Sequence, residues 1–202
     1  MFNIYEFIIF LFTFIIYTIA GLLITPFVMI YTKNVTDTNY CNPIFGILIL
    51  IAEAMFVLQT PYVNLAYSAN KFKNMTIPAY IEAILNIIFS MILVKTMGLT
   101  GVAIGTLIAM TYRTIYQVIF LKKEIMNRSV WIFFKKLILF TVTGGIGILI
   151  CVFLMPKIQY TIYSWIIHGI IYTLIMLILY SIVSYIFYKE EVKYLFKFVK
   201  FH

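Results

Sequence analysis

Three charged side chains, Glu53, Glu82 and Arg113, lie inside apolar stretches that are each about 20 residues long, the length of a membrane-spanning helix. On membrane-insertion scales, a charged side chain at the centre of a spanning helix costs about 2.5 to 3.5 kcal/mol. A span that keeps such a group therefore uses it to carry a proton, to bind an ion or to form an ion pair. The 39 residues from Thr76 to Thr114 hold two of the three charges, together with Asn86 and a GxxxG pattern.

Glu53 has the chemistry of a coupling acid. It lies nine residues into the apolar run 44–67, which places it roughly 14 Å from the start of the run and close to the bilayer midplane. At helical spacing, Thr60 and Asn64 project on the same side as Glu53. We expect this stripe to face a cavity in which Glu53 carries a proton or coordinates a cation. The alternative is an acid that is kept protonated, or bonded to a neighbouring helix, for packing alone.

Glu82 and Arg113 are related by the tight turn KTMGLTG, because they lie sixteen residues before and fifteen residues after Gly98. An antiparallel hairpin puts them at one depth, about 6 to 12 Å from the nearer membrane boundary by helix rise. An ion pair between the two helices would offset much of the cost of burying either charge. The alternative is that each side chain reaches the headgroup region on its own.

Asn86, Gly101 and Gly105 are predicted to pack this hairpin together. Asn86 follows Glu82 at one helical turn, and the two glycines form a GxxxG on the second helix. Small residues at this spacing let two helix backbones approach closely, and an amide can hydrogen-bond between helices. The pattern therefore indicates helix packing more than chemistry.

Two prolines and one histidine complete the set of notable residues within the apolar runs. Pro61 removes a backbone hydrogen bond eight residues after Glu53, so it should bend that helix, whereas Pro78 is expected in the first turn of its helix. An intramembrane enzyme would need paired catalytic groups at one depth. His168 has no acidic neighbour in sequence, so we expect packing there and no enzymatic activity.

The composition defines the class of protein that must position these residues. Hydrophobic residues make up 64% of the chain and charged residues 11%, against about 45 to 50% and about 25% in soluble domains. The sequence therefore predicts an all-α integral membrane protein. Six apolar runs are long enough to span a bilayer, at 7–30, 44–67, 78–96, 101–121, 137–155 and 161–187.

The distribution of Lys and Arg predicts the orientation, because cytoplasmic loops carry the excess. One side holds three cations, Lys33, Lys95 and Lys157. The other side holds eleven: Lys71, Lys73, Lys122, Lys123, Arg128, Lys135, Lys136, Lys189, Lys193, Lys197 and Lys200. We therefore expect both termini in the cytoplasm. The cations are spread among the loops and form no basic face, so nucleic acid is not an expected partner.

The tail at 188–202 separates apolar from cationic residues at helical spacing. Its sequence after Tyr188 is KEEVKYLFKFVKFH. This pattern is typical of an amphipathic helix that lies on the anionic inner leaflet, which makes membrane lipids an expected partner. The alternative is a frayed, solvated tail, because so short a helix is marginal by itself.

The sequence predicts no cofactor and no metal. It contains no Walker A, GxGxxG, HExxH or GxSxG pattern, and its two cysteines, Cys41 and Cys151, lack metal-ligand spacing. The loops are too short for a nucleotide-binding domain, so any pumping must draw on an ion gradient or on substrate supply.

Four segments of the chain form a distinctive combination: ITPFVMIYTKNVTDTNY (24–40), TPYVNLAYSANKFKN (60–74), AYIEAILNIIFSMILVKTMGLTGVAIGTLIAMTYR (79–113) and the loop KKEIMNRS. Together they resemble the C-terminal half of polysaccharide flippases in the multidrug/oligosaccharidyl-lipid/polysaccharide exporter superfamily, which includes the MATE proteins. The hairpin resembles the eleventh and twelfth helices of such proteins. The resemblance therefore implies that the six spans correspond to helices nine to fourteen.

The resemblance implies an ion-coupled flippase that exports an undecaprenyl-linked oligosaccharide across the plasma membrane for cell-surface polysaccharide synthesis. Glu53 would be the coupling acid, and Glu82 and Arg113 would be a structural or gating pair. The polar groups of the cavity would be Gln59, Tyr62 and Asn64. It also implies that the chain is one part of a larger protein, whose N-terminal lobe or upstream fragment would be a partner. A MATE-type drug or metabolite antiporter fragment and an inactive truncated remnant are the alternatives.

Overall fold

The computed structural model describes residues 1–35, 40–156 and 158–200, and the side chains as far as residue 197. Lys157, counted above among the cations of one side, and the side chains of Val199 and Lys200 in the tail lie outside the described residues. Within these ranges every regular element is an α-helix. The helices are α1 (Phe2–Tyr31), α2 (Pro43–Leu58), α3 (Thr60–Ser68), α4 (Phe72–Met97), α5 (Leu99–Glu124), α6 (Trp131–Leu154), α7 (Ile162–Phe187) and α8 (Lys189–Lys200).

Six helical segments are long and apolar enough to cross a membrane, with α2 and α3 together forming one of them. The prediction of an all-α, multi-pass membrane protein with six spans is confirmed at this level. Several helices extend beyond the apolar runs: α4 begins at Phe72 and α6 at Trp131, each six residues earlier than its run. Backbone hydrogen bonding continues through polar flanking residues, so hydropathy marks the membrane-buried part and not the end of the helix.

Pro78 does not occupy a first turn, which corrects the expectation from the sequence. Because α4 begins at Phe72, Pro78 lies inside the helix. Its ring nitrogen carries no proton, so it cannot donate to the carbonyl of Asn74 one turn earlier. Pro78 therefore leaves an acceptor without its usual helical donor.

The expected bend at Pro61 coincides with a one-residue interruption between two helices. α2 ends at Leu58, Gln59 forms a turn, and α3 begins at Thr60 with Pro61 in its first turn. The carbonyl oxygen of Gln59 accepts from the backbone nitrogens of Tyr62 and Val63 at 3.0 and 3.1 Å, which starts the new helix. We call this break the α2–α3 joint.

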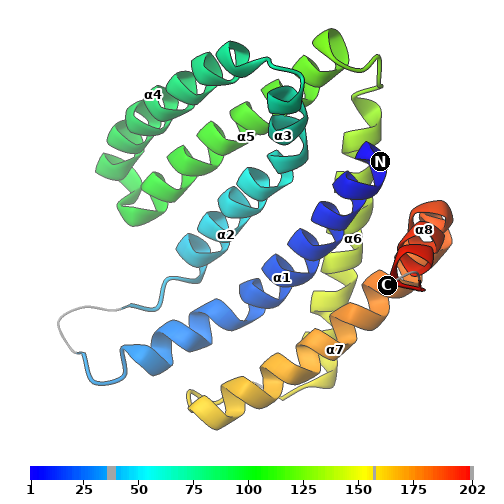
Figure 1. Ribbon diagram of the computed structural model, residues 1–202. Helices are drawn as coiled ribbons and strands as arrows, with labels where there is room; N and C mark the ends of the chain where they lie inside the picture. Colours follow the sequence, from blue (N-terminus) through cyan, green and yellow to red (C-terminus); the bar gives the residue numbers. More distant parts are fainter. Residues whose placement is uncertain (36–39, 157, 201–202) are drawn as a thin grey trace. The chain divides into compact units, whose positions relative to one another are not determined.

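The helices group into two compact units, one of Met1–Lys33 with Leu137–His202 and one of Asn34–Lys136. We call them unit 1 and unit 2. Unit 1 contains α1, α7, α8 and most of α6, whereas unit 2 contains α2 to α5 and the start of α6 (Figure 1).

In unit 2, α5 is the central helix, with α4 antiparallel to it and α2 parallel to it (Figure 1). The parallel register follows from two hydrogen bonds: Asn42 Nδ2 donates to Thr100 Oγ1 at 3.4 Å, and Thr114 Oγ1 donates to the carbonyl oxygen of Met55 at 2.8 Å. Residues of α2 therefore lie level with residues 58 or 59 positions later in α5.

Unit 1 is held together by aromatic rings. Phe140 of α6 lies 6.3 Å from Phe7 and 6.1 Å from Phe10, centroid to centroid, in edge-on contacts with α1. Its ring also stacks on that of Tyr180 of α7 at 5.7 Å, and the Tyr180 hydroxyl donates to the Phe140 carbonyl oxygen at 3.1 Å. Offset and edge-on ring pairs of this kind contribute about 0.5 to 1.5 kcal/mol each beyond the area they bury.

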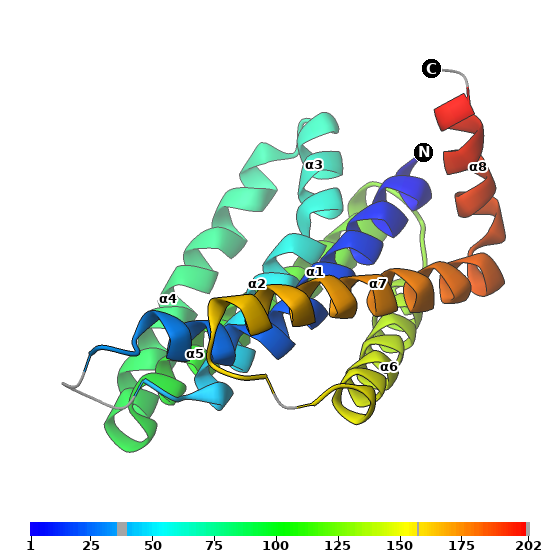
Figure 2. The same ribbon diagram turned by 90° about the horizontal axis from the view of Figure 1, so that it is seen from below.

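The tail forms the helix α8, which leaves the end of α7 at a sharp angle (Figure 2). Its apolar residues Val192 and Leu195 are half-buried. Lys193 is exposed and pairs with Glu190 at 3.2 Å. The contact of α8 with a lipid surface stays a prediction.

Candidate functional site: the polar residues of unit 2

Glu82 of α4 and Arg113 of α5 form an ion pair, in which Arg113 Nη1 donates to Glu82 Oε2. Their side chains keep only 11% and 18% of their exposure, respectively, so the pair is largely removed from solvent. Equal depth on either side of Gly98 places the two charges next to each other. Because each charge compensates its partner, the pair permits two ionised groups within the hairpin.

The turn and the glycines of the hairpin set how closely α4 and α5 approach. Gly98 has φ 58° and ψ −138°, a backbone conformation that side-chain-bearing residues rarely adopt. At Gly105, an added Cβ would lie 2.6 Å from Ser90 Oγ and 2.7 Å from the Ser90 nitrogen, and at Gly101 it would overlap the Leu93 carbonyl. Only glycine fits at this helix contact.

Asn86 takes part in a hydrogen-bond network across the same contact. Its Oδ1 accepts from Ser90 Oγ at 3.1 Å, within α4, and from Thr106 Oγ1 at 3.2 Å, on α5. Thr106 Oγ1 also lies 3.1 Å from the carbonyl of Val102. The hairpin thus holds an ion pair and an amide–hydroxyl network on one helix interface.

Glu53 of α2 directly follows Ala52, which is fully buried. The buried residues of α2 are Ala52, Met55 and Leu58. At helical spacing, the exposed residues Ile44, Ile47 and Ile51 lie on the side of α2 opposite Glu53. It is half-buried and has no hydrogen bond or ion pair with any described residue.

The α2–α3 joint lies between Glu53 and the other residues of its predicted stripe. Thr60 and Asn64 belong to α3, whereas Glu53 belongs to α2, and the backbone of Gln59 between them has the helical angles φ −76° and ψ −19°. Thr60 is half-buried, and Asn64 is exposed. The structure therefore gives one isolated carboxyl in α2 and two polar side chains on the next helix.

Gln59 and Tyr62, two of the expected cavity groups, have buried side chains. Tyr62 is 1% exposed, and its ring meets Phe133 edge-on at 5.8 Å. Gln59 is 3% exposed, and its Oε1 has no hydrogen-bond partner among the described residues. Gln59 follows Met55, whose carbonyl accepts from Thr114 of α5, by one helical turn.

The sequence interpretation missed two polar residues of α5 in this region. Thr114 donates to the Met55 carbonyl and so joins α5 to α2. Gln117 is 1% exposed, and neither its Oε1 nor its Nε2 has a hydrogen-bond partner among the described residues. Thr114 and Gln117 lie one and four residues after Arg113. This spacing could have indicated their burial, because helical periodicity puts all three residues on the broad buried side of α5.

Unit 1 contains a further buried acid, Glu6 of α1, which is 0% exposed. Tyr188, between α7 and α8, is beside it: burial, together with the nearby carboxylates of Glu191 and Glu6, raises the pKa of Tyr188 to about 12. An acid so near the start of a helix would be expected at the membrane surface, so hydropathy alone does not indicate its burial.

His168 of α7 has its ring nitrogens occupied. Its Nε2 lies 3.1 Å from the carbonyl oxygen of Pro156, and its Nδ1 lies 2.7 Å from the carbonyl oxygen of Ser164 and 3.3 Å from Ser164 Oγ. Both carbonyl oxygens are acceptors, so each ring nitrogen faces a group to which it can only donate. His168 thereby joins the preceding loop to α7, which is the packing role expected from the sequence.

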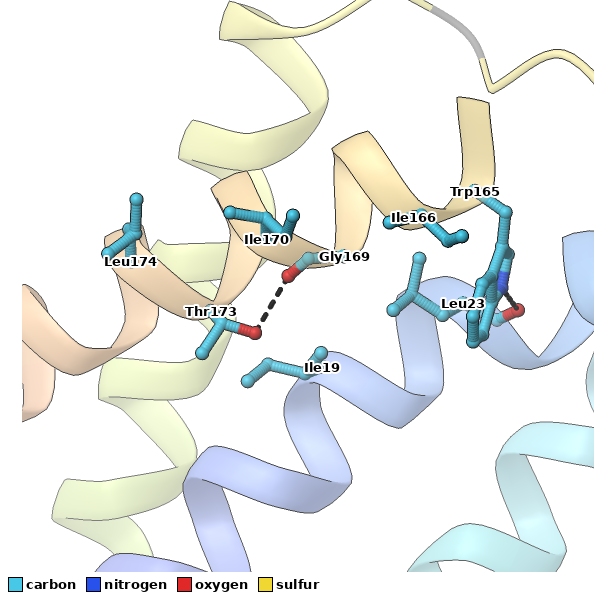
Figure 3. A pocket seen from close by; sticks show the side chains of 8 residues that line it. All are labelled: Ile19, Leu23, Trp165, Ile166, Gly169, Ile170, Thr173 and Leu174. Carbon is cyan, nitrogen blue, oxygen red and sulfur yellow. Dashed lines mark hydrogen bonds between the residues drawn. The ribbon is translucent and has the colours of Figure 1, made fainter. Parts of the chain in front are cut away.

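A shallow groove of about 380 Å³ lies between α1 and α7 in unit 1 (Figure 3). Its polar groups are already bonded: Thr173 Oγ1 donates to the Gly169 carbonyl at 2.7 Å, and Trp165 Nε1 donates to the Leu23 carbonyl at 3.1 Å. The groove therefore offers an apolar surface with no free polar group among its labelled side chains, as suits contact with hydrocarbon.

Comparison with known proteins adds no relative, because no family model, no curated protein and no solved structure matches the chain.

Proposed function

We propose that this chain is part of an ion-coupled membrane transporter in which Glu53 is the coupling acid. The observation that carries the proposal is the position of the Glu53 carboxyl. It is half-buried within a spanning segment, and no described residue bonds to it.

An ionised carboxyl at this position needs a compensating interaction. An ionised acid near the middle of a span costs about 2.5 to 3.5 kcal/mol, so it must be protonated, hydrated by a cavity or paired with a cation. The ion pair of unit 2 already uses Glu82 with Arg113. Glu53 is thus available to exchange a proton or a small cation, which is the step that couples a transporter to an ion gradient.

For the substrate, we propose a lipid-linked oligosaccharide, exported across the plasma membrane by a flippase of which this chain forms the C-terminal part. The support is the resemblance of residues 79–113 to the corresponding hairpin of polysaccharide flippases. The close-packed α4–α5 hairpin, with its glycine contacts and internal ion pair, suits a lobe that moves as a block during alternating access.

The test is export of lipid-linked glycan by the complete protein in cells, comparing Glu53→Gln with Glu53→Asp. Glu124→Gln is the matched control, because Glu124 is an acid of unit 2 that is 47% exposed in a surface pair. Export should be lost in Glu53→Gln, retained at least in part in Glu53→Asp and unchanged in Glu124→Gln, at equal amounts of protein in the membrane. Unchanged export in Glu53→Gln would remove Glu53 from the mechanism.

A second assay on the same cells distinguishes the alternatives. Proton-driven efflux of a fluorescent cationic dye that depends on Glu53, with glycan export unaffected, would support a MATE-type antiporter instead. Absence of both activities in the complete wild-type protein would support an inactive remnant.

A further inference from the structure

We propose that unit 2 encloses a buried water-binding site beside the α2–α3 joint, held by Gln59 and Gln117. This inference does not depend on the transport proposal. It starts from two amides that are 3% and 1% exposed and that together present three atoms without a hydrogen-bond partner among the described residues. Leaving such an atom unsatisfied in a protein interior costs about 1 to 3 kcal/mol, so each one implies an unseen partner.

The helix registers place the two amides at one level. Thr114 of α5 bonds to the carbonyl of Met55 in α2, and the two helices run parallel. One turn further along both helices, Gln59 of α2 comes level with Gln117 of α5. Both side chains lie in the same register layer, next to the interface of α2 with α5.

The antiparallel register of α4 brings one proline, Pro78, to the same layer, and a second, Pro61, follows Gln59 by two residues. Glu82 pairs with Arg113, and Met75 clusters with Phe120, so Gln117 lies level with Pro78 between these two contacts. Pro78 in α4 and Pro61 in α3 each lack the backbone N–H of a normal helical residue. Within membranes, ordered water is one of the means by which carbonyls freed by proline regain a hydrogen bond.

The kinds of atom that lack partners identify the ligand as water. Gln59 Oε1 and Gln117 Oε1 are acceptors, whereas Gln117 Nε2 is a donor, as is Arg113 Nε, which is also buried without a partner among the described residues. A cation would satisfy only the acceptors, and an anion only the donors. Water both donates and accepts, and a buried water typically makes about three hydrogen bonds to otherwise unsatisfied groups.

The test uses the fact that the chain contains three glutamines, Gln59, Gln117 and Gln159. The whole protein, labelled with ¹⁵N at the glutamine side chains, gives one NH₂ signal pair for each in detergent micelles, and Gln→Met variants assign them. Gln159 is the internal control, because it lies in an exposed loop. Cross-relaxation with water is measured at mildly acidic pH, where amide protons exchange slowly.

We expect the NH₂ protons of Gln59 and Gln117 to show water contacts with nuclear Overhauser effects of opposite sign in the laboratory and rotating frames, the signature of long-lived bound water. Gln159 should show only the weak effect of mobile surface water. Gln117→Met should abolish the bound-water signal at Gln59, because the site is shared. Thr114→Val should leave it in place, which excludes relay through the Thr114 hydroxyl.

Absence of a bound-water signal at both buried amides would overturn the proposal, as would a signal at Gln59 that survives in Gln117→Met. A high-resolution structure of the wild-type protein gives an independent measurement. Ordered water within hydrogen-bonding distance of both amides would support the site, whereas a direct Gln59–Gln117 bond with no water would refute it.

Discussion

The ion pair between Glu82 and Arg113 permits a quantitative prediction, tested by neutralising each charge alone and both together. With side chains 11% and 18% exposed, the pair is mostly buried, so a charge left without its partner loses most of its compensation. Breaking a buried pair costs about 3 to 5 kcal/mol in soluble proteins, and a lone charge in a span costs about 2.5 to 3.5 kcal/mol. Allowing for the residual exposure, we expect Glu82→Gln to destabilise the protein by about 2 to 3 kcal/mol.

Arg113→Gln should destabilise the protein less than Glu82→Gln. In Arg113→Gln the remaining carboxylate can be neutralised by taking up a proton, whereas in Glu82→Gln the guanidinium of Arg113 keeps its charge. We expect about 1 to 2 kcal/mol for Arg113→Gln, and about 1 to 2 kcal/mol for the double variant, in which no charge remains. The double variant should therefore cost less than the sum of the two single variants, by roughly 2 kcal/mol.

The assay is equilibrium unfolding in lipid–detergent mixed micelles as the fraction of denaturing detergent is raised. The matched control is the pair of Lys71 with Glu124, which also joins a residue of α5 to its surroundings, at 3.4 Å, but is 40% and 47% exposed. Its glutamine variants should cost about 0.2 to 1 kcal/mol. Additive costs at Glu82 and Arg113 would refute the reasoning, because additivity means that the two charges do not depend on each other.

Three further predictions concern glycine contacts and one tyrosine. Gly105→Ala should destabilise the hairpin by about 1 to 3 kcal/mol in the same unfolding assay, since its Cβ would lie 2.7 Å from the Ser90 nitrogen, whereas Gly145→Ala, with nothing within 4 Å, should not destabilise. Gly98→Ala should cost about 1 to 3 kcal/mol, because it forces a side chain into φ 58°, and Gly21→Ala in α1 is its control; equal stability of the two variants would contradict the backbone argument. Because the pKa of Tyr188 rises from 10.0 to about 12 in the folded protein, its contribution to stability should be complete below pH 10 and disappear as the pH rises to about 12. Tyr188→Phe should flatten that part of the stability curve, and a curve unchanged from the wild type would contradict the assignment.

The sequence predicts the membrane class and the hairpin well because both depend on short-range patterns. Run length alone gives the six spans, and the distance of Glu82 and Arg113 from Gly98 gives their common depth in an antiparallel pair. Both arguments need only the geometry of a single helix or of two consecutive helices.

Residues that depend on neighbours distant in sequence were not predictable in this way. Gln117 is buried because α5 is flanked by both α2 and α4, which widens the buried side of α5 beyond the narrow stripe expected from one contact. Helical spacing likewise groups Thr60 and Asn64 with Glu53, but it does not show that Glu53 belongs to α2 and the other two to α3. Pro61 signals a bend, yet the sequence does not say that the helix stops and restarts there.

The Glu82–Arg113 pair also bears on how the chain enters a membrane during synthesis. The two residues are 31 positions apart, so α4 leaves the ribosome with its acid before the compensating arginine of α5 has been made. With only Gly98 between the two helices, α5 follows α4 without a loop in which the chain could pause. We therefore expect α4 and α5 to partition into lipid together, with α4 held in the insertion machinery until α5 has been synthesised.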